Sequence, residues 1–583
     1  MHFELSSRTR LQLRKHVRGV MRLRSAIICV LCCALAPSAA VCGSIYARWK
    51  NGPPSSEDFF PIAVWWQNPA VMGNTGKFPS VAAAAASMGI NVYLGEGGWP
   101  ENFGSDNGEL ETAKEYHQYI VGGIYTPYNE NTSAQSVASV LALANKIGAQ
   151  RNVIGYNMGD EPDCSGDDNN GLSFAKIPAA VAELETYDNT RLVTFNQSFW
   201  PMQPYWWGVC GAPAKAALRA ISIGSMDYYP VTNANLISYD YHYPGNLPSH
   251  YYAGKSDFRT IANDTLWVQG IATQALIRAG APGQPTWVFV ESGGDNLDSG
   301  GYNNFPGSVQ ANSTTLTNKS GWSRFTALWE GLAVSGNGIP ASTTIVKIID
   351  STHAELSQPA STTVSSEAIT VADDCRHGAN LCVVNGNEYR PTASQVNSEV
   401  WLSLLSGANG IEYFCNDATS DFFCLGGTSG GAAARETREN LTFVDAHVRQ
   451  FARQLNAPTI GACAMVNMLP SGVIVTVPVC TNGLLTMATD RPLVPGVAMA
   501  KSYKGATYLF AMSDRRSSNG AQFTFTLAGA AGRTAKIVFD SNAKYHPTRN
   551  TTGKHIKVSV LGGFTDAFGL GGDDYQVKAY EIQ

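Results

Sequence analysis

Short apolar segments alternate with longer stretches of helical periodicity up to about residue 455. Eight of these segments resemble β-strands, at residues 59–66, 90–98, 118–125, 152–161, 191–200, 220–230, 286–294 and 410–415. Strands separated by helices are typical of a parallel sheet, in which a crossover helix joins one strand to the next. Eight such units over about 360 residues predict a (β/α)8 barrel, or TIM barrel, with insertions.

Two regions depart from this alternation. Residues from about 335 to 373 are rich in Ser, Thr, Val and Ile in short alternating runs, which predicts a small β insertion between the seventh and eighth units. After residue 455 the helical pattern ends, and strand-like segments follow one another between Gly and Asn turns, as in an all-β sandwich. The predicted fold is α/β, with a barrel at 44–455 that carries the insertion and a C-terminal β-sandwich domain at 456–583.

The first 43 residues have the pattern of a secretory signal peptide. A basic segment precedes an apolar run that ends in small residues, and the run is shorter than the roughly 20 residues that a membrane span requires. We expect the mature protein to be secreted, outside the cell or to the periplasm, and to have no integral membrane segment.

Export would place the later cysteines in an oxidising compartment, which favours disulfides. Closeness in sequence suggests four pairs, although the sequence alone leaves the connectivity open. These pairs are Cys375–Cys382, Cys415–Cys424, Cys463–Cys480 and Cys164–Cys210.

The composition argues against several classes of function. The formal charge of −5 is small for 583 residues and the basic residues beyond the leader are scattered, so no nucleic-acid-binding surface is expected. Beyond the leader there is no Cys-x-x-Cys pair, and no glycine-rich phosphate-binding motif follows a strand. Neither a metal nor an organic cofactor is implied, and an uncharged partner fits better.

Polar and aromatic residues gather at the carboxyl ends of the predicted strands, where barrel enzymes build their sites. The expected cleft contains Trp65, Trp66, Glu96, Trp99, Asp160, Glu161, Asn196, Trp200, Asp227, Tyr228, Tyr229 and Glu291. Aromatic faces stack on the C–H patches of sugars, and carboxylates and amides bind sugar hydroxyls. The set predicts a carbohydrate substrate, while plain packing is the common alternative role for each large aromatic residue.

Four segments together resemble the retaining glycoside hydrolases of the clan A (β/α)8 superfamily: FFPIAVWWQNP, GYNMGDEPD, WVFVESGG and SEVWLSLLSGANGIEYFC. The similarity covers roughly residues 57–455. In that superfamily an acid/base Glu ends the fourth strand and a nucleophile Glu ends the seventh, which implies Glu161 and Glu291 here. Retention requires one carboxyl to protonate the leaving oxygen and another, about 5–5.5 Å away, to attack the anomeric carbon. The resemblance thus implies hydrolysis of β-glycosidic bonds. Tyr228 ends the sixth strand-like segment, beside the seventh, and from that place we expect it to orient Glu291.

One position departs from the superfamily pattern. Many members have Asn before the acid/base Glu, whereas this chain has Asp160. Adjacent Asp and Glu also resemble the pair of substrate-assisted hexosaminidases, in which the Asp orients a 2-acetamido group that attacks in place of an enzyme carboxylate. A third alternative is a carbohydrate-binding barrel without catalytic activity.

Overall fold

The computed structural model describes residues 44–65, 78–94, 109–123, 151–162, 173–198, 211–227, 229, 267–292, 304–319, 333–350, 352–372, 383–384, 388–389, 393–414, 431–468, 475–490, 496–513, 520–569 and 575–583. The leader-like segment lies outside these ranges, so the signal peptide stays a prediction. Among the helices within them, none has both the length and the apolar character that crossing a bilayer demands.

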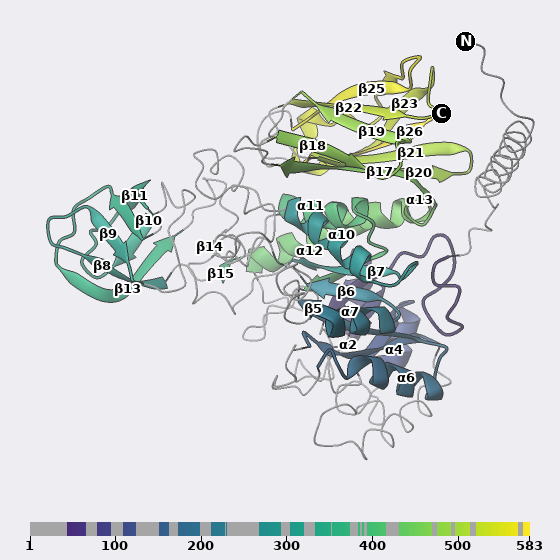
Figure 1. The fold of residues 1–583 in the computed structure, drawn as a ribbon, viewed down its shortest axis with the longest axis horizontal. Helices are drawn as coiled ribbons and strands as arrows, with labels where there is room; N and C mark the ends of the chain where they lie inside the picture. The colour runs from purple at the N-terminus through teal and green to yellow at the C-terminus, as the bar shows by residue number, and fades with distance from the viewer. Residues whose placement is uncertain are drawn as a thin grey trace, which may run out of the picture. The chain divides into compact units, whose positions relative to one another are not determined.

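The eight predicted strands form a closed parallel barrel (Figure 1). They are β1 (Ile62–Trp65), β2 (Val92–Leu94), β3 (Tyr119–Gly123), β4 (Val153–Asp160), β5 (Leu192–Ser198), β6 (Gly224–Asp227), β7 (Thr286–Glu291) and β16 (Gly410–Phe414). They follow one another around the barrel in chain order, and β16 closes it by pairing with both β7 and β1. The barrel predicted from the sequence is confirmed.

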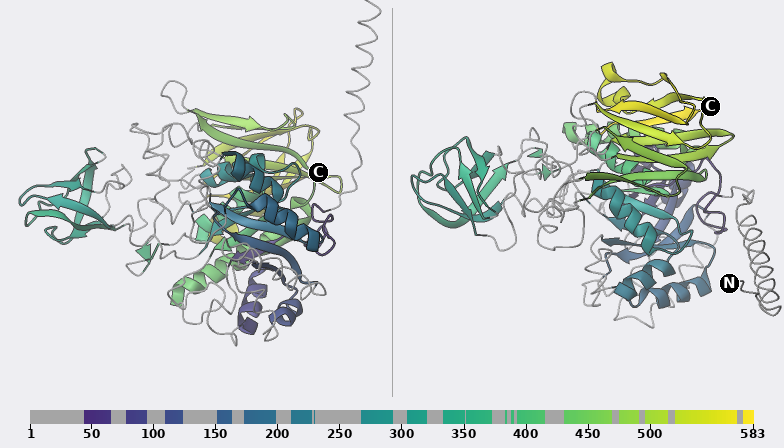
Figure 2. Two further views of the ribbon diagram at one scale, coloured as in Figure 1. Left: turned by 60° about the horizontal axis from the view of Figure 1, so that its bottom comes forward. Right: turned by 45° about the horizontal axis from the view of Figure 1, so that its top comes forward.

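Helices connect the strands and cover the outside of the barrel (Figure 2). They are α2 (Phe78–Met88), α4 (Glu109–Glu115), α6 (Ile177–Tyr187), α7 (Gly211–Ala220), α10 (Trp267–Ala279), α11 (Ala393–Leu405), α12 (Gly431–Gln450) and α13 (Ala452–Leu455). In α6 the buried residues Ile177, Ala180, Val181 and Leu184 have the spacing of one helical face. Pro178 lies in the first turn of this helix, where its missing N–H has no partner to lose.

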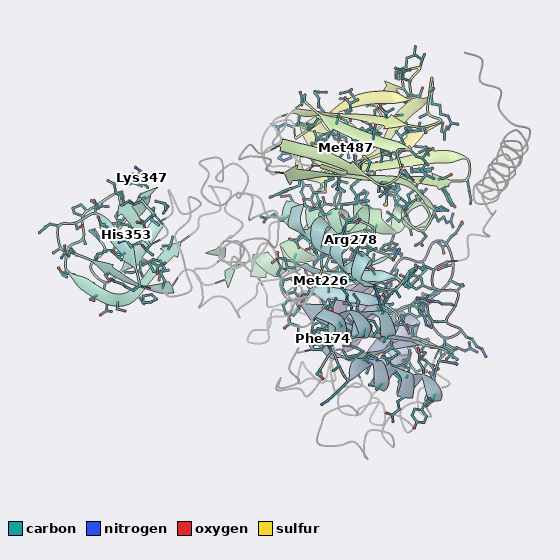
Figure 3. All side chains as sticks on the ribbon, viewed as in Figure 1. Phe174, Met226, Arg278, Lys347, His353 and Met487 are labelled. Carbon is teal, nitrogen blue, oxygen red and sulfur yellow. A yellow bond between two sulfur atoms is a disulfide. The ribbon has the colours of Figure 1, made fainter. Side chains whose placement is uncertain are left out.

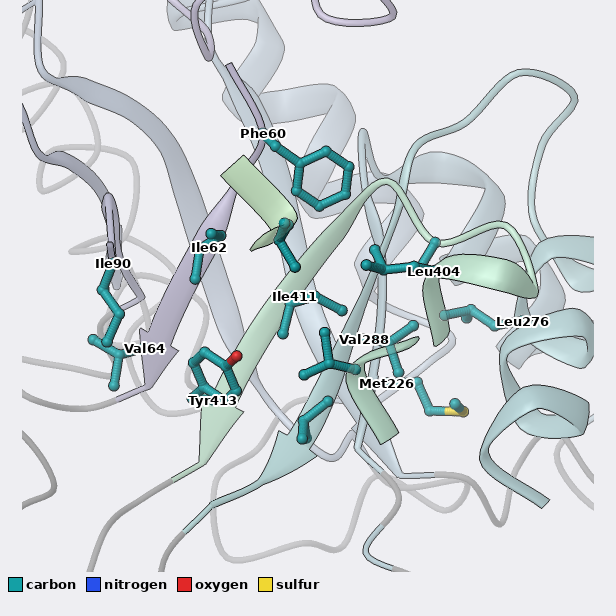
Figure 4. Packing of buried hydrophobic residues seen from close by; sticks show 14 of the residues in the cluster. Phe60, Ile62, Val64, Ile90, Met226, Leu276, Val288, Leu404, Ile411 and Tyr413 are labelled. Carbon is teal, nitrogen blue, oxygen red and sulfur yellow. The ribbon is translucent and has the colours of Figure 1, made fainter. Parts of the chain in front are cut away.

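Alternation along the strands divides the barrel residues into two layers, because successive side chains of a strand point to opposite faces. Val288 and Ile411 pack in the outer layer against the helices, as Figure 4 shows. Trp287 and Phe289, on the same strand as Val288, belong to a separate cluster inside the barrel. A polar residue in phase with this inner cluster therefore lies in the barrel interior.

A second closed barrel, of six antiparallel strands, lies between β7 and α11 in the sequence. Its strands are β8 (Asn304–Val309), β9 (Thr315–Asn318), β10 (Ala333–Gly336), β11 (Thr343–Ile348), β12 (His353–Leu356) and β13 (Val364–Ala372), and Figure 3 labels Lys347 and His353 on it. It encloses its own core, which includes Phe305 and Leu316. The insertion expected at about 335–373 therefore omits β8 and β9, because the Pro and Gly of β8 do not have the pattern of a strand. A short hairpin, β14 (Val383–Val384) with β15 (Glu388–Tyr389), follows it.

The C-terminal region forms two antiparallel sheets, with strand orders β18-β17-β20-β21-β26-β23-β24 and β19-β22-β25. The strands are β17 (Thr459–Met468), β18 (Val475–Cys480), β19 (Leu485–Thr489), β20 (Gly496–Tyr503), β21 (Ala506–Ser513), β22 (Ala521–Leu527), β23 (Thr534–Asp540), β24 (His555–Lys557), β25 (Gly563–Phe568) and β26 (Val577–Ile582). Between β23 and β24 lie two short elements, α14 (Asn542–Tyr545) and η9 (Pro547–Arg549). One hydrophobic cluster joins the two sheets, with Phe525 of β22 packed 6.1 Å from Tyr580 of β26 between ring centroids.

Cys463 and Cys480 are directly opposite each other on β17 and β18 and form a disulfide, with 4.1 Å between their Cα atoms. The other three cysteine pairs proposed from the sequence lie outside the described residues.

The larger C-terminal sheet shares a hydrophobic core with the outer layer of the barrel. Trp401 of α11 is fully buried and stacks on Phe510 of β21 and on Phe539 of β23, with centroid distances of 5.9 and 5.5 Å. Because α11 also packs against β7, this sheet supports the helix that lies behind one of the proposed catalytic strands.

Replacing Trp401 by Ala is expected to destabilise the protein by about 3–5 kcal/mol, because it removes a buried aromatic side chain from a packed core. Chemical unfolding of the wild type and the variant measures the difference. Leu561→Ala, at a side chain that is 84% exposed, is the control and should change stability little. A loss below about 1 kcal/mol in Trp401→Ala would contradict the shared core.

Candidate active site

The carboxyl end of β4 departs from regular strand geometry. Asn157 pairs with Thr194 of β5 and Asp160 with Asn196, so that three residues of β4 span two of β5. Glu161, directly after the strand, has a φ of +41° and donates its N–H to the carbonyl of Asn196 at 2.9 Å. A left-handed backbone at a residue other than Gly costs about 1–3 kcal/mol and is concentrated at functional sites. The bulge and this conformation together direct Asp160 and Glu161 to the barrel rim.

The outer side of the same strand is held by a polar network. The hydroxyl of Tyr156 donates to Asp188 at 2.7 Å, and Arg191 forms an ion pair with the same carboxylate at 2.6 Å. Arg191 also donates to the carbonyl of Val153 at 2.7 Å, which ties the network to the start of β4. These contacts fix the strand from behind while its inner side carries the acids.

Three acids and one amide meet at the ends of β4, β5 and β6. Nδ2 of Asn196 donates to Oδ1 of Asp160 at 2.8 Å, and the same amide hydrogen-bonds to Asp227. Asp227 also hydrogen-bonds to the carboxyl of Glu161. Burial, and then the charges of Glu161 and Asp160, raise the pKa of Asp227 well above its usual value. Asp227 therefore stays protonated, and its O–H group donates a hydrogen bond to the exposed Glu161.

Glu291, the last residue of β7, is paired with a second acid. It is 1% exposed, and its charge acts on Glu399 from α11, which is fully buried. Burial, and then the charge of Glu291, raise the pKa of Glu399 well above its usual value. Glu399 is therefore held in its neutral form beside Glu291.

A third buried acid, Glu412 of β16, lies inside the barrel. Its sequence neighbours Ile411 and Tyr413 belong to the outer layer, and both are labelled in Figure 4. Oε2 of Glu412 lies 2.6 Å from Oγ of Ser225 on β6. Burial raises the pKa of Glu412 to about 8; the hydrogen bond with Ser225 opposes this rise and the charge of Asp160 adds to it.

The remaining residues expected in the cleft are placed as follows. Trp65 is 3% exposed and packs edge-on against Phe289 inside the barrel, with centroids 5.4 Å apart. Tyr229 is half-buried and stacks on Phe414 at 5.3 Å. Outside the described residues lie Trp66, Glu96, Trp99, Trp200 and Tyr228.

Sequence reasoning gave no role to Ser225, Glu399 or Glu412, and it named Asp227 only as part of the cleft. The signal for the two glutamates is an acid within an apolar segment, in SEVWLSLL for Glu399 and in GIEYFC for Glu412. Among the residues that the structure describes, no group of three or more His, Cys, Asp or Glu is arranged to hold a metal ion.

Several solved glycoside hydrolases are similar to this chain in structure. A noncanonic maltogenic alpha-amylase AmyB from Thermotoga neapolitana matches at 8% identity over 90% of this chain and 99% of its own, with a TM-score of 0.40. The endo-beta-1,4-mannanase from Thermotoga petrophila matches at 9% identity over 81% and 96%, with a TM-score of 0.34. AbfB, a family 51 alpha-L-arabinofuranosidase from Bifidobacterium longum, matches at 10% identity over 93% and 99%, with a TM-score of 0.37.

No family model and no curated protein matches the chain. Since the structural similarities are so remote, the function is inferred from the geometry of the barrel's own residues.

Glu412 predicts a dependence of stability on pH. Its folded pKa of about 8 exceeds the usual 4.5, so the unfolded chain ionises first and stability falls as pH rises from about 4.5 to about 8, then levels off. The full change is about 5 kcal/mol. Glu412→Gln should lack the part of the decline that Glu412 causes, so its stability should fall less steeply than that of the wild type in urea unfolding at several pH values across that window. The exposed Glu367→Gln serves as the control and should follow the wild type; parallel curves for the wild type and Glu412→Gln would contradict the prediction.

Proposed function

We propose that this protein is a glycoside hydrolase whose acid/base residue is Glu161. The observation that carries the proposal is the hydrogen bond between Glu161 and the protonated Asp227 at the carboxyl-terminal rim of a parallel eight-stranded barrel. Glu161 is exposed and is held in a left-handed backbone conformation. It lies at the end of the barrel where barrel enzymes bind their substrates, and Asp227 beside it carries a proton.

The Glu161–Asp227 pair can donate the proton that the leaving oxygen needs during glycosidic cleavage. Asp227 keeps its proton because burial and the neighbouring acids make its ionisation unfavourable. In the proposed first step, a proton passes from this pair to the glycosidic oxygen as the bond to the anomeric carbon breaks. In the second step, Glu161 accepts a proton from the water that attacks the anomeric carbon.

Glu291 is the proposed nucleophile. It ends β7, the strand at which the superfamily resemblance implies this role. Glu399 supports the proposal because burial favours its neutral form, so that it places no second negative charge beside Glu291. In this mechanism Glu291 attacks the anomeric carbon, and the glycosyl ester is hydrolysed in the second step with retention of configuration. The β-linkage of the substrate rests on the same resemblance.

A second mechanism is favoured by the position of Asp160. This acid is fixed beside Glu161 by Asn196, whereas Glu291 is buried and already engaged by Glu399. In substrate-assisted hydrolysis Asp160 would orient a 2-acetamido group of the sugar, and that group would attack the anomeric carbon in place of Glu291.

Secretion is part of the proposal and is supported by residues 1–43, which have the pattern of a signal peptide. The carbohydrate substrate would then be met in the periplasm or outside the cell.

The test is release of chromophore from aryl α- and β-glycosides, including N-acetylhexosaminides, by the wild type, Glu161→Gln and Glu291→Gln. Glu161→Gln should lose about 10²- to 10⁴-fold on substrates with poor leaving groups, because these need general-acid catalysis. Its kcat/KM should fall much less on dinitrophenyl glycosides, because kcat/KM reports the first step and this leaving group departs without a proton. The exposed Glu367→Gln provides a matched control and should keep full activity.

The activities of the Glu291→Gln and Asp160→Asn variants distinguish the two mechanisms. With Glu291 as nucleophile, Glu291→Gln should be inactive on all substrates, including dinitrophenyl glycosides. Activity confined to N-acetylhexosaminides, with loss in Asp160→Asn and little loss in Glu291→Gln, would transfer the nucleophile to the substrate. A wild type that hydrolyses no glycoside in the panel or in a set of polysaccharides, yet binds them, would indicate a carbohydrate-binding barrel instead.

A further inference from the structure

A row of hydrogen-bonding groups crosses the barrel interior from β16 to β4. Oε2 of Glu412 lies 2.6 Å from Oγ of Ser225, which in turn lies 3.3 Å from Oδ1 of Asn196. Nδ2 of Asn196 lies 2.8 Å from Oδ1 of Asp160. The row connects a buried carboxyl with the acids at the rim.

The number of available hydrogens determines which group is the donor and which is the acceptor in each hydrogen bond of this row. The amide of Asn196 presents its NH2 group to Asp160 and Asp227, because its oxygen would be repelled there. Its Oδ1 therefore faces Ser225, which is the donor. A serine hydroxyl has one hydrogen, so when Ser225 donates to Asn196 the contact with Glu412 needs a hydrogen from Glu412.

The surroundings of Glu412 independently favour its neutral form. It is fully buried, and its neighbours in register are Ala63 on β1 and Phe289 on β7. Among the described residues its Oε1 has no hydrogen-bond partner. An ionised carboxylate at this position would have one donor at most, which is far from enough to offset the cost of desolvation.

We propose that Glu412 is a positioning residue, which in its protonated form donates to Ser225 so that Ser225 donates to Asn196 and the amide keeps Asp160 and Asp227 beside Glu161. When Glu412 loses its proton, Ser225 turns its hydrogen toward the new carboxylate, and Oδ1 of Asn196 loses its donor. The effect on catalysis rests on the proposed glycosidase function, whereas the protonation of Glu412 does not.

The proposal sets an alkaline limit on activity. The hydrogen bonds of the row would reverse direction when Glu412 loses its proton, and the pKa of Glu412 is about 8. The protonated fraction falls from about one half at pH 8 to about one eleventh at pH 9, so kcat/KM of the wild type should fall about fivefold over this range. Within the described ranges, two titratable groups act on Glu412 or feel its charge. They are Asp160 from β4, and Tyr46, whose hydroxyl donates to the carbonyl of Asn409 and accepts from Trp287. Burial raises the pKa of Tyr46, so this phenol stays neutral across the range.

The experiment compares the wild type, Glu412→Gln, Ser225→Ala and the control Glu367→Gln. Glu412→Gln keeps a donor for Ser225 at every pH, so its activity near pH 7 should stay close to the wild type and should not fall between pH 8 and 9. Ser225→Ala removes the donor to Asn196 and should lower kcat at every pH. Glu367→Gln should reproduce the wild-type profile.

A second readout needs no substrate. The infrared difference between wild type and Glu412→Gln should contain the C=O band of a carboxylic acid near pH 6, which disappears with a midpoint near pH 8. The frequency of this band should shift in Ser225→Ala, because the acid loses its acceptor. Absence of the band near pH 6, or a band that Ser225→Ala leaves unchanged, would overturn the proposal.

The two readouts separate this inference from the proposed function. An active enzyme in which Glu412→Gln keeps the alkaline fall would refute the positioning role and leave the glycosidase proposal intact. An inactive wild type would refute the glycosidase proposal, and the infrared titration would then decide by itself whether protonated Glu412 donates to Ser225.

Discussion

The buried interior of this fold, within the barrel and beneath its helices, cannot accommodate several ionised carboxylates at once, and this constraint governs the candidate site. Asp227, Glu399 and Glu412 are each raised in pKa first of all by burial. Each has a polar partner that differs from the others': Glu161, Glu291 or Ser225. Because these three buried acids are protonated, the negative charge remains on acids at the rim such as Asp160 and Glu161, where a substrate would be bound. The distribution of protons, more than the number of acids, therefore defines the chemistry of this site.

The backbone of β4 shows how the fold produces this distribution. A regular strand would place Asp160 and Glu161 on opposite faces, one inward and one among the helices. The bulge opposite Thr194 and Asn196 brings Asp160 level with Asn196, and the positive φ of Glu161 turns the chain at the rim. The strain in that conformation is sustained by the packing and hydrogen bonds around the strand. The same local irregularity thus supplies two acids to one side of the site.

The sequence predicted the architecture well because the barrel strands are apolar segments of the right length, separated by amphipathic helices. It marked Asp160, Glu161, Asn196 and Glu291 as candidates because polar residues at strand ends interrupt that pattern. It could not indicate the partners of these residues, since Glu399 and Glu412 lie within segments that look like ordinary core. Their pairing depends on which strands and helices become neighbours in space, and no local pattern encodes a contact such as that between Ser225 and Glu412, 187 residues apart.

The pairing of acids also links stability to the proposed function. A buried neutral carboxyl lowers the stability of the fold as pH rises, because the unfolded chain gains from ionisation that the native barrel does not permit. An apolar residue at position 412 would avoid that loss but would leave the hydroxyl of Ser225 without the polar partner that it has on β16. The presence of Glu inside an otherwise apolar layer between Ala63 and Phe289 is thus explained by the rim that it orders rather than by the core that surrounds it.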